Sequence, residues 1–176
     1  MNLYLKQKVF SIHDKFTVYD NNETPVYTVE GKIISIHNKH SIYNTAGEEV
    51  ANITRKVISL TNKFFIERPP GHVYEMKGKL AFAHEVYAFP ELGWELKGRF
   101  MQHDYVITKD GQEIASIHQK WLSWGDTYEI TVSDGVDEVL VLAVMLCIDI
   151  VHSIEDETAV GGAAAAGAGT IANSNN

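Results

Sequence analysis

The sequence GVDEVLVLAVMLCIDIVHSI, residues 135–154, decides the fold. Its run from Val139 to Ile148 is wholly apolar, whereas the apolar residues upstream mostly alternate with polar ones. As a strand, this segment would extend about 60 Å, well beyond the usual length of strands. A membrane-spanning helix needs ~20 consecutive apolar residues, and Asp149 and His152 interrupt this run. We therefore interpret residues 136–154 as a helix buried in the centre of the protein.

The residues around this helix agree with that interpretation. Asp134 or Ser133 is expected to cap its first turn, because short polar side chains accept hydrogen bonds from free backbone N–H groups. Asp137 and Glu138 lie where the positive end of the helix dipole favours negative charge. The sequence thus predicts a helix start just before residue 137.

A repeated hairpin precedes the helix. Residues 43–66 align without a gap with residues 107–130, so that Gly47 matches Gly111, and residues 19–29 form a looser copy. Each copy reads as strand, turn, strand, and the whole chain gives roughly ten to twelve short strands. Because a helix that is apolar on every side must be enclosed, we predict a mainly β fold. It is a closed antiparallel barrel of about twelve strands around the helix.

This organisation leaves one domain, residues 1–156, followed by a Gly-, Ala- and Asn-rich tail, residues 157–176, that is predicted to be disordered. Asp149 is the unusual residue of the helix, since it lies near the negative end of the dipole. We expect it to be structural, bonded to backbone amides or to a Tyr, Trp or Lys at the mouth of the barrel. A role for Asp149 as a catalytic acid has no support in the neighbouring sequence.

The charge, the cysteine content and the N-terminal sequence exclude several classes of function. The formal net charge of −8 over 176 residues argues against nucleic acid as a general partner. Cys147 is the only cysteine, so there is no disulfide framework, and its place in the apolar run predicts a small buried hydrophobe. The N-terminus lacks the unbroken apolar region of a signal peptide, so we expect a cytoplasmic protein.

Several segments together resemble a known family. The hairpins FTVYDNNETPVYTVEGK (residues 16–32) and YVITKDGQEIASIHQKWLSWGDTYEI (residues 105–130), followed by an apolar helix ending in CIDIV, resemble the LURP-one-related family. That family belongs to the Tubby C-terminal-like superfamily, which also contains the phospholipid scramblases. The resemblance, over roughly residues 1–155, implies a twelve-stranded barrel around a hydrophobic C-terminal helix. It supplies no catalytic residues, and the basic residues with which Tubby binds phosphoinositides have no matching motif here.

Enzyme and metal motifs are weak. His37 and His40 form an HxxH pair, but residues three apart on a strand point to opposite faces. The sequence has neither a GxSxG motif nor a phosphate-binding loop of the GxxxxGK[ST] or GxGxxG type. Ser123, between Trp121 and Trp124, reads as a turn residue. We therefore expect no catalytic residue, metal site or cofactor, and we identify no small-molecule substrate.

One constellation carries a binding hypothesis. The sequences VEGKI, MKGKL and LKGRF each place a basic residue directly after a glycine that follows a strand. Structurally, each glycine would make a bulge or a tight corner of the barrel, with a solvated Lys or Arg beside it. Functionally, these corners would present cations to an anion such as a lipid headgroup. The proposed anion-binding residues are Lys32, Lys77, Lys79, Lys97 and Arg99.

We interpret the chain as a non-enzymatic binding or scaffolding domain, with anionic phospholipid or a protein as partner, located in the cytoplasm or peripherally at a membrane. One alternative is a scramblase-like protein that uses the apolar helix as a membrane anchor. A second alternative is a small-ligand barrel enzyme, which would require a cavity beside the helix lined with convergent polar groups. The oligomeric state stays open.

Overall fold

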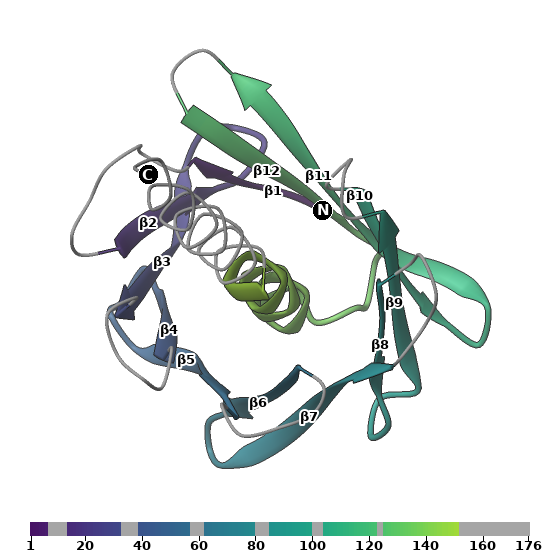
Figure 1. Cartoon of the computed structure of the whole chain (residues 1–176). Coiled ribbons are helices and arrows are strands. Elements are labelled where there is room, and N and C mark those ends of the chain that lie inside the picture. The colour runs from purple at the N-terminus through teal and green to yellow at the C-terminus, as the bar shows by residue number, and fades with distance from the viewer. Residues whose placement is uncertain are drawn as a thin grey trace, which may run out of the picture.

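In the part of the chain that the structure describes, twelve antiparallel strands form one closed barrel, and a helix runs along its interior (Figure 1). This architecture is seen in a computed structural model that describes residues 1–6, 14–32, 39–56, 62–79, 85–99, 104–122 and 125–151. It confirms the predicted fold class. Residues 152–154 of the predicted helix and the predicted tail, residues 157–176, lie outside the described residues.

Each strand pairs with the next one in the chain, and the first strand closes the barrel by pairing with the last. The strands are β1 (Asn2–Lys6), β2 (Asp14–Tyr19), β3 (Pro25–Lys32), β4 (Lys39–Asn44), β5 (Glu49–Arg55), β6 (Lys63–Arg68), β7 (His72–Lys79), β8 (Glu85–Phe89), β9 (Trp94–Arg99), β10 (Asp104–Lys109), β11 (Gln112–Leu122) and β12 (Gly125–Val132).

The sequence repeat corresponds to two equivalent parts of the wall. Residues 43–66 run from the end of β4 to β6, and residues 107–130 run from β10 to β12. The matched glycines Gly47 and Gly111 occupy the turns after β4 and β10, with φ of 79° and 78°. These positive φ angles are costly for residues that have a Cβ atom, which explains why glycine stands at both positions.

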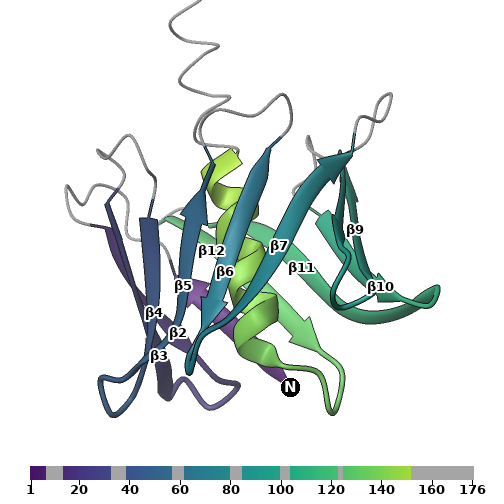
Figure 2. The ribbon, with the colours of Figure 1, turned by 90° about the horizontal axis from the view of Figure 1, so that it is seen from below.

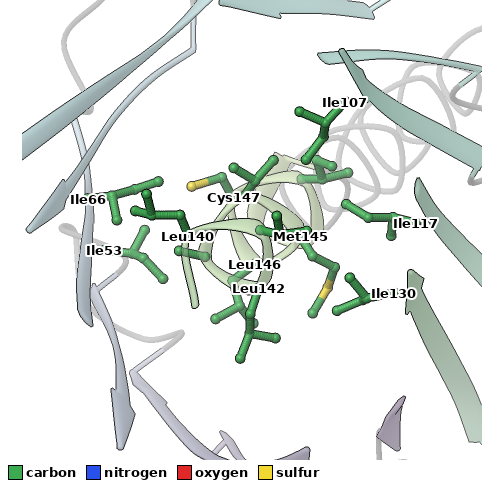
Figure 3. Packing of buried hydrophobic residues seen from close by; sticks show 14 of the residues in the cluster. Ile53, Ile66, Ile107, Ile117, Ile130, Leu140, Leu142, Met145, Leu146 and Cys147 are labelled. Carbon is green, nitrogen blue, oxygen red and sulfur yellow. The ribbon is translucent and has the colours of Figure 1, made fainter. Parts of the chain in front are cut away.

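The helix comprises residues 138–151 in the described part of the chain. All ten side chains from Val139 to Ile148 are at most 6% exposed. Figure 3 shows helix side chains pointing towards the wall on several sides, with Met145 beside Ile130 and Leu140 beside Ile66. A helix that is buried all round excludes solvent from the barrel axis, as its composition predicted.

The start of the helix differs from the prediction. The cap is Asp137, and neither Asp134 nor Ser133 has this role: Asp137 Oδ1 accepts hydrogen bonds from the backbone N–H groups of Val139 (3.0 Å) and Leu140 (3.2 Å). The choice was ambiguous in sequence because all three side chains are good caps, and only the backbone path after β12 decides among them.

The barrel has two rims (Figure 2). The helix-start rim contains residue 137 and the turns at residues 45–48 and 69–71. At the helix-end rim β3, β5, β7 and β9 end, at Lys32, Arg55, Lys79 and Arg99. All five proposed anion-binding residues are therefore on strands that run towards the helix-end rim.

Candidate functional site

The three corner glycines face aromatic rings on the neighbouring strands. In the strand register Gly31 pairs with His40, Gly78 with Tyr87, and Gly98 with Tyr105. A Cβ atom on Gly31 or Gly98 would overlap the ring of its partner, and one on Gly78 would lie 3.3 Å from the Tyr87 ring. The partner side chains are buried, so each glycine makes room for a ring on the inner wall.

The strand registers exclude a bulge at each of the three glycines, one of the two structural interpretations of these positions. The register shifts of the barrel fall at other places, between Val18 and Tyr19, between Ile42 and Tyr43, and between Ile107 and Thr108. The three corner glycines are thus regular strand positions and not bulges. The sequence could not reveal this, because the ring that requires each glycine belongs to another strand.

Lys77 and Lys97 stand directly before two of these glycines; Lys77 is half-buried and Lys97 is exposed. Their side chains have 44% and 60% of their surface accessible. Side chains alternate along a strand, so a residue next to an inward-facing glycine points outwards. The side chains of Lys32, Lys79 and Arg99 lie outside the described part of the structure.

Both lysines have carboxylate neighbours on their own strand. Lys77 Nζ lies 2.6 Å from Glu75, which also binds Lys63 at 2.7 Å, and Lys97 Nζ lies 3.3 Å from Glu95. Hydrogen bonds from Lys63 and Lys77 hold the pKa of Glu75 below its usual value. The Lys97–Glu95 pair is exposed and therefore weak in water, which leaves the Lys97 ammonium available to a competing anion. Glu75 is only 19% accessible, so Lys77 is held more firmly.

The strand register brings four of the five positions together. Across β8, Lys79 pairs with Val86, which pairs on its other side with Lys97, so the two basic residues are two strands apart, about 10 Å. Lys77 and Arg99 lie on the same two strands. Lys32 lies on β3, which β4, β5 and β6 separate from β7.

A network at the helix-start rim ties the helix to the wall. The Arg68 guanidinium lies 2.9 Å from the Asp137 carboxylate and also donates to the backbone carbonyl of Val50. The Tyr27 hydroxyl donates to Glu138 (3.1 Å), and burial together with the Glu138 charge raises the pKa of Tyr27 to about 12. The network holds the first helical turn against β3, β5 and β6.

Asp149 is bound to the wall at the other half of the helix. The Tyr128 hydroxyl donates a hydrogen bond of 2.9 Å to Asp149 Oδ1. This contact confirms the expectation of a tyrosine partner for Asp149. Tyr128 is 2% exposed, so its hydroxyl depends on partners inside the protein.

Neither the cysteine nor the acidic and histidine side chains of the described residues form a reactive or metal-binding site. Cys147 is fully buried, as predicted, and burial raises the pKa of its thiol, which keeps it from forming a reactive thiolate. In the described ranges no three His, Cys, Asp or Glu side chains come close enough to hold a metal ion. His37 and Ser123 lie outside those ranges.

Two open grooves lie on the outer wall, at equivalent positions of the repeat. One, of about 560 Å³, crosses β2, β3 and the turn after β4; the other, of about 330 Å³, crosses β8, β9 and the turn after β10. Glu30 lines the first groove and Lys97 the second. Neither groove is the polar cavity beside the helix that a barrel enzyme would require.

Sequence reasoning missed two inward-facing polar residues. His40 was considered only as a metal ligand, and Arg55 was not singled out. Both lie on the inner wall near the helix-end rim, where Arg55 pairs with the buried Phe64. The signal was available in principle, since Arg55 stands two residues after Ile53 in a strand of alternating pattern.

The fold and these contacts define a class: a closed β-barrel domain whose interior is filled by its own C-terminal helix. Comparisons with known proteins place the chain more closely. The family model described as LURP-one-related matches residues 1–149. This chain belongs to the LURP-one-related family.

One relative by sequence and one solved structure with a similar fold resemble this chain. The uncharacterized protein YxjI of Bacillus subtilis (strain 168) is 30% identical over 160 residues, which cover 90% of this chain and 98% of YxjI. A protein from Arabidopsis thaliana, solved by X-ray crystallography, has a similar fold with a TM-score of 0.61 at 15% identity. The match covers 85% of this chain and 91% of the plant protein. Among the described residues, no helix is both long and apolar enough to span a membrane.

Proposed function

We propose that this protein is a non-enzymatic binding or scaffolding domain that recognises anionic phospholipid headgroups on the outside of its barrel, as a peripheral protein on the cytoplasmic face of a membrane. One observation carries the proposal: the helix occupies the barrel interior, with Val139–Ile148 buried against the wall. A ligand must therefore bind at a rim or on the outer surface.

The binding residues of this proposal are the five basic positions near the helix-end rim. Four of them, Lys77, Lys79, Lys97 and Arg99, lie on β7 and β9 on either side of β8. Lys32 adds a cation on β3 at the same rim. In a protein of net charge −8, such a local concentration of cations would orient one end of the barrel towards an anionic surface.

The two alternative functions, a membrane anchor and a small-ligand enzyme, would each require a change in this structure. An anchor role would take the helix out of the barrel and expose its ten buried apolar side chains, at about 1.5–3 kcal/mol for each large one. A barrel enzyme would need polar groups converging on a cavity beside the helix, whereas the described wall residues around it are mostly apolar. The binding domain needs neither change.

Vesicle flotation tests the proposal. We expect the protein to float with phosphatidylcholine vesicles that contain phosphatidylserine, and not with phosphatidylcholine alone, and we expect high salt to release it. Lys97→Gln should weaken binding about fivefold, since each lysine near the surface contributes about 1 kcal/mol. Substituting Lys77, Lys79, Lys97 and Arg99 together by Gln should abolish binding.

Lys109→Gln is the matched control, because Lys109 is also exposed, lies on the adjacent strand β10 and ends that strand at the opposite rim. It removes the same charge and should leave flotation nearly unchanged. An absence of flotation at low salt would refute the proposal, and equal losses for both single variants would refute this choice of surface.

A further inference from the structure

Two polar side chains interrupt the apolar inner wall on β4 and β5. The inward residues Ile42 and Ile53 are fully buried. Towards the helix-end rim, the next inward positions are His40 on β4 and Arg55 on β5. His40 pairs with Ile53, so Arg55, two residues further on, is the diagonal neighbour of His40 on the same face. Diagonal neighbours are about 7–8 Å apart, within reach of long side chains.

Each of these side chains has a buried nitrogen without a partner. His40 is 5% exposed, and its Nδ1 makes no hydrogen bond. Arg55 donates from Nη2 to Asn62 Oδ1 at 3.0 Å, while its Nε–H is buried and unbonded. Among the ion pairs of the described residues, none involves Arg55. A buried polar atom without a partner costs about 1–3 kcal/mol, so the unbonded Nε–H of Arg55 and the unbonded Nδ1 of His40 together indicate a missing group.

Basic residues adjoin this pair in the sequence but not on the inner face. Lys39 precedes the inward His40, Lys56 follows the inward Arg55, and both lysines are exposed. Gly31, opposite His40 on β3, brings no charge, and Asp149 of the helix is bonded to Tyr128 on β12. Arg55 is thus the charged group that the described neighbouring strands place beside His40. Burial lowers the pKa of His40 to about 4, so the ring is neutral at pH 7.

The other half of the repeat lacks this cation. The ungapped alignment places Gln119 on β11 at the position of Arg55 on β5. Gln119 also has a buried unbonded atom, but that atom is the acceptor Oε1. The barrel therefore accepts a neutral amide at this wall position, and of the two described positions that the repeat matches, Arg55 is the one with a guanidinium.

We infer that Arg55 and His40 form a binding site for an oxyanion, a phosphate or carboxylate group, on the inner wall of the helix-end rim. The guanidinium supplies two features that an oxyanion needs, a fixed positive charge and a free N–H donor. A neutral imidazole supplies a second donor when Nδ1 carries the proton, and an anion would also favour the imidazolium form. The site uses residues and a face of the wall that the headgroup proposal does not.

The test uses Arg55→Gln, because the repeat shows that Gln is accommodated at this position. We expect wild-type protein to bind inorganic phosphate and sulfate in calorimetric titrations, and Arg55→Gln to bind them about 10- to 100-fold more weakly. Lys109→Gln, which removes a charge at the opposite rim, should bind as the wild type does. A chloride titration at equal ionic strength corrects for general screening.

A second measurement does not depend on a variant that folds. The imidazole resonances of His40 should titrate at higher pH in sulfate than in chloride, because a bound oxyanion stabilises the protonated ring. Vesicles with phosphatidic acid form a further arm, which distinguishes a lipid phosphate from a free one. Binding to these vesicles that Arg55→Gln abolishes, without binding of free phosphate or sulfate, would assign the oxyanion to a lipid.

Two results would overturn the inference. One is binding of phosphate, sulfate and the vesicles by Arg55→Gln with wild-type affinity. The other is a His40 titration unchanged by sulfate together with no binding in either arm. Loss of vesicle binding in the Lys77, Lys79, Lys97 and Arg99 variant, with phosphate binding retained, would separate this site from the exterior surface.

Discussion

The Arg68 guanidinium lies 2.9 Å from the carboxylate of Asp137, which stands 69 residues later in the chain and caps the central helix. One carboxylate thus accepts backbone hydrogen bonds from the first helical turn and a charged hydrogen bond from the end of β6. This contact joins the first turn of the helix directly to the end of β6.

Asp137→Ala should lower the free energy of unfolding by about 1–3 kcal/mol, since it removes the cap and the partner of Arg68. Asp137→Asn keeps an oxygen that can cap and loses only the charge, so its cost should be smaller, about 1 kcal/mol or less. Urea unfolding measures both. Equal losses for the two variants would assign the whole effect to the ion pair.

Asp149→Ala should lower the melting temperature, because the Tyr128 hydroxyl loses its acceptor at 2.9 Å in a buried site. The expected cost is about 1–3 kcal/mol. In the Tyr128→Phe background the same substitution should cost less, since the hydroxyl is already absent. An unchanged melting temperature of Asp149→Ala would remove this contact from the structural core.

Gly98→Ala should destabilise the barrel more than Gly78→Ala does. The added methyl group on Gly98 overlaps the ring of Tyr105, whereas on Gly78 it meets the Tyr87 ring at 3.3 Å and the Asn62 carbonyl at 3.2 Å. Overpacking of this kind costs typically about 1–3 kcal/mol. Thermal unfolding compares the variants. In a Tyr105→Val background, the penalty of Gly98→Ala should shrink, and an undiminished penalty would argue against ring packing as its cause.

The stability of the protein should fall as the pH drops from about 6.5 to about 4 because of His40. Burial holds its folded-state pKa near 4, below the unfolded value of 6.5, so the unfolded state binds the proton first. The contribution of neutral His40 to the free energy of unfolding is fully present above pH 6.5. Its complete loss at low pH amounts to roughly 3 kcal/mol. Urea unfolding across this range, in chloride without oxyanions, measures it.

His40→Phe is the control for this dependence, because it keeps a ring over Gly31 and removes the titrating group. Between pH 6.5 and 4 its stability should change less steeply than that of the wild type. If both proteins show the same slope, carboxylates elsewhere account for the acid sensitivity, and His40 does not.

The fold could be predicted from sequence because its two signals are local. The run from Val139 to Ile148 is apolar on every side of a helix, and the Gly47 and Gly111 turns mark the hairpins. Together they leave a barrel as the arrangement that buries the helix. The partner of Asp149, Tyr128, is also of an expected type, since Tyr, Trp and Lys are among the few side chains that can donate to a carboxylate inside a barrel wall.

The site could be predicted only in part, because it depends on cross-strand pairing. That Gly31 lies opposite His40, and that Arg55 is its diagonal neighbour, follows from registers which alternation alone does not set. The basic residues after the glycines were visible as a pattern in the sequence. The rings that require the glycines, and the unpaired nitrogens beside them, became visible only with the strands in place.

The pairing of β1 with β12 has a consequence for synthesis of the chain. The Met1 ammonium donates to the carbonyl of Val132, a partner 131 residues away. At roughly 5–20 residues per second, β1 leaves the ribosome on the order of ten seconds before the strand that covers its free edge. Until then the nascent wall has two open edges and an empty apolar interior, a state that invites pairing with other chains. A requirement for chaperones during translation would follow, and release of the last strand and the helix would end it.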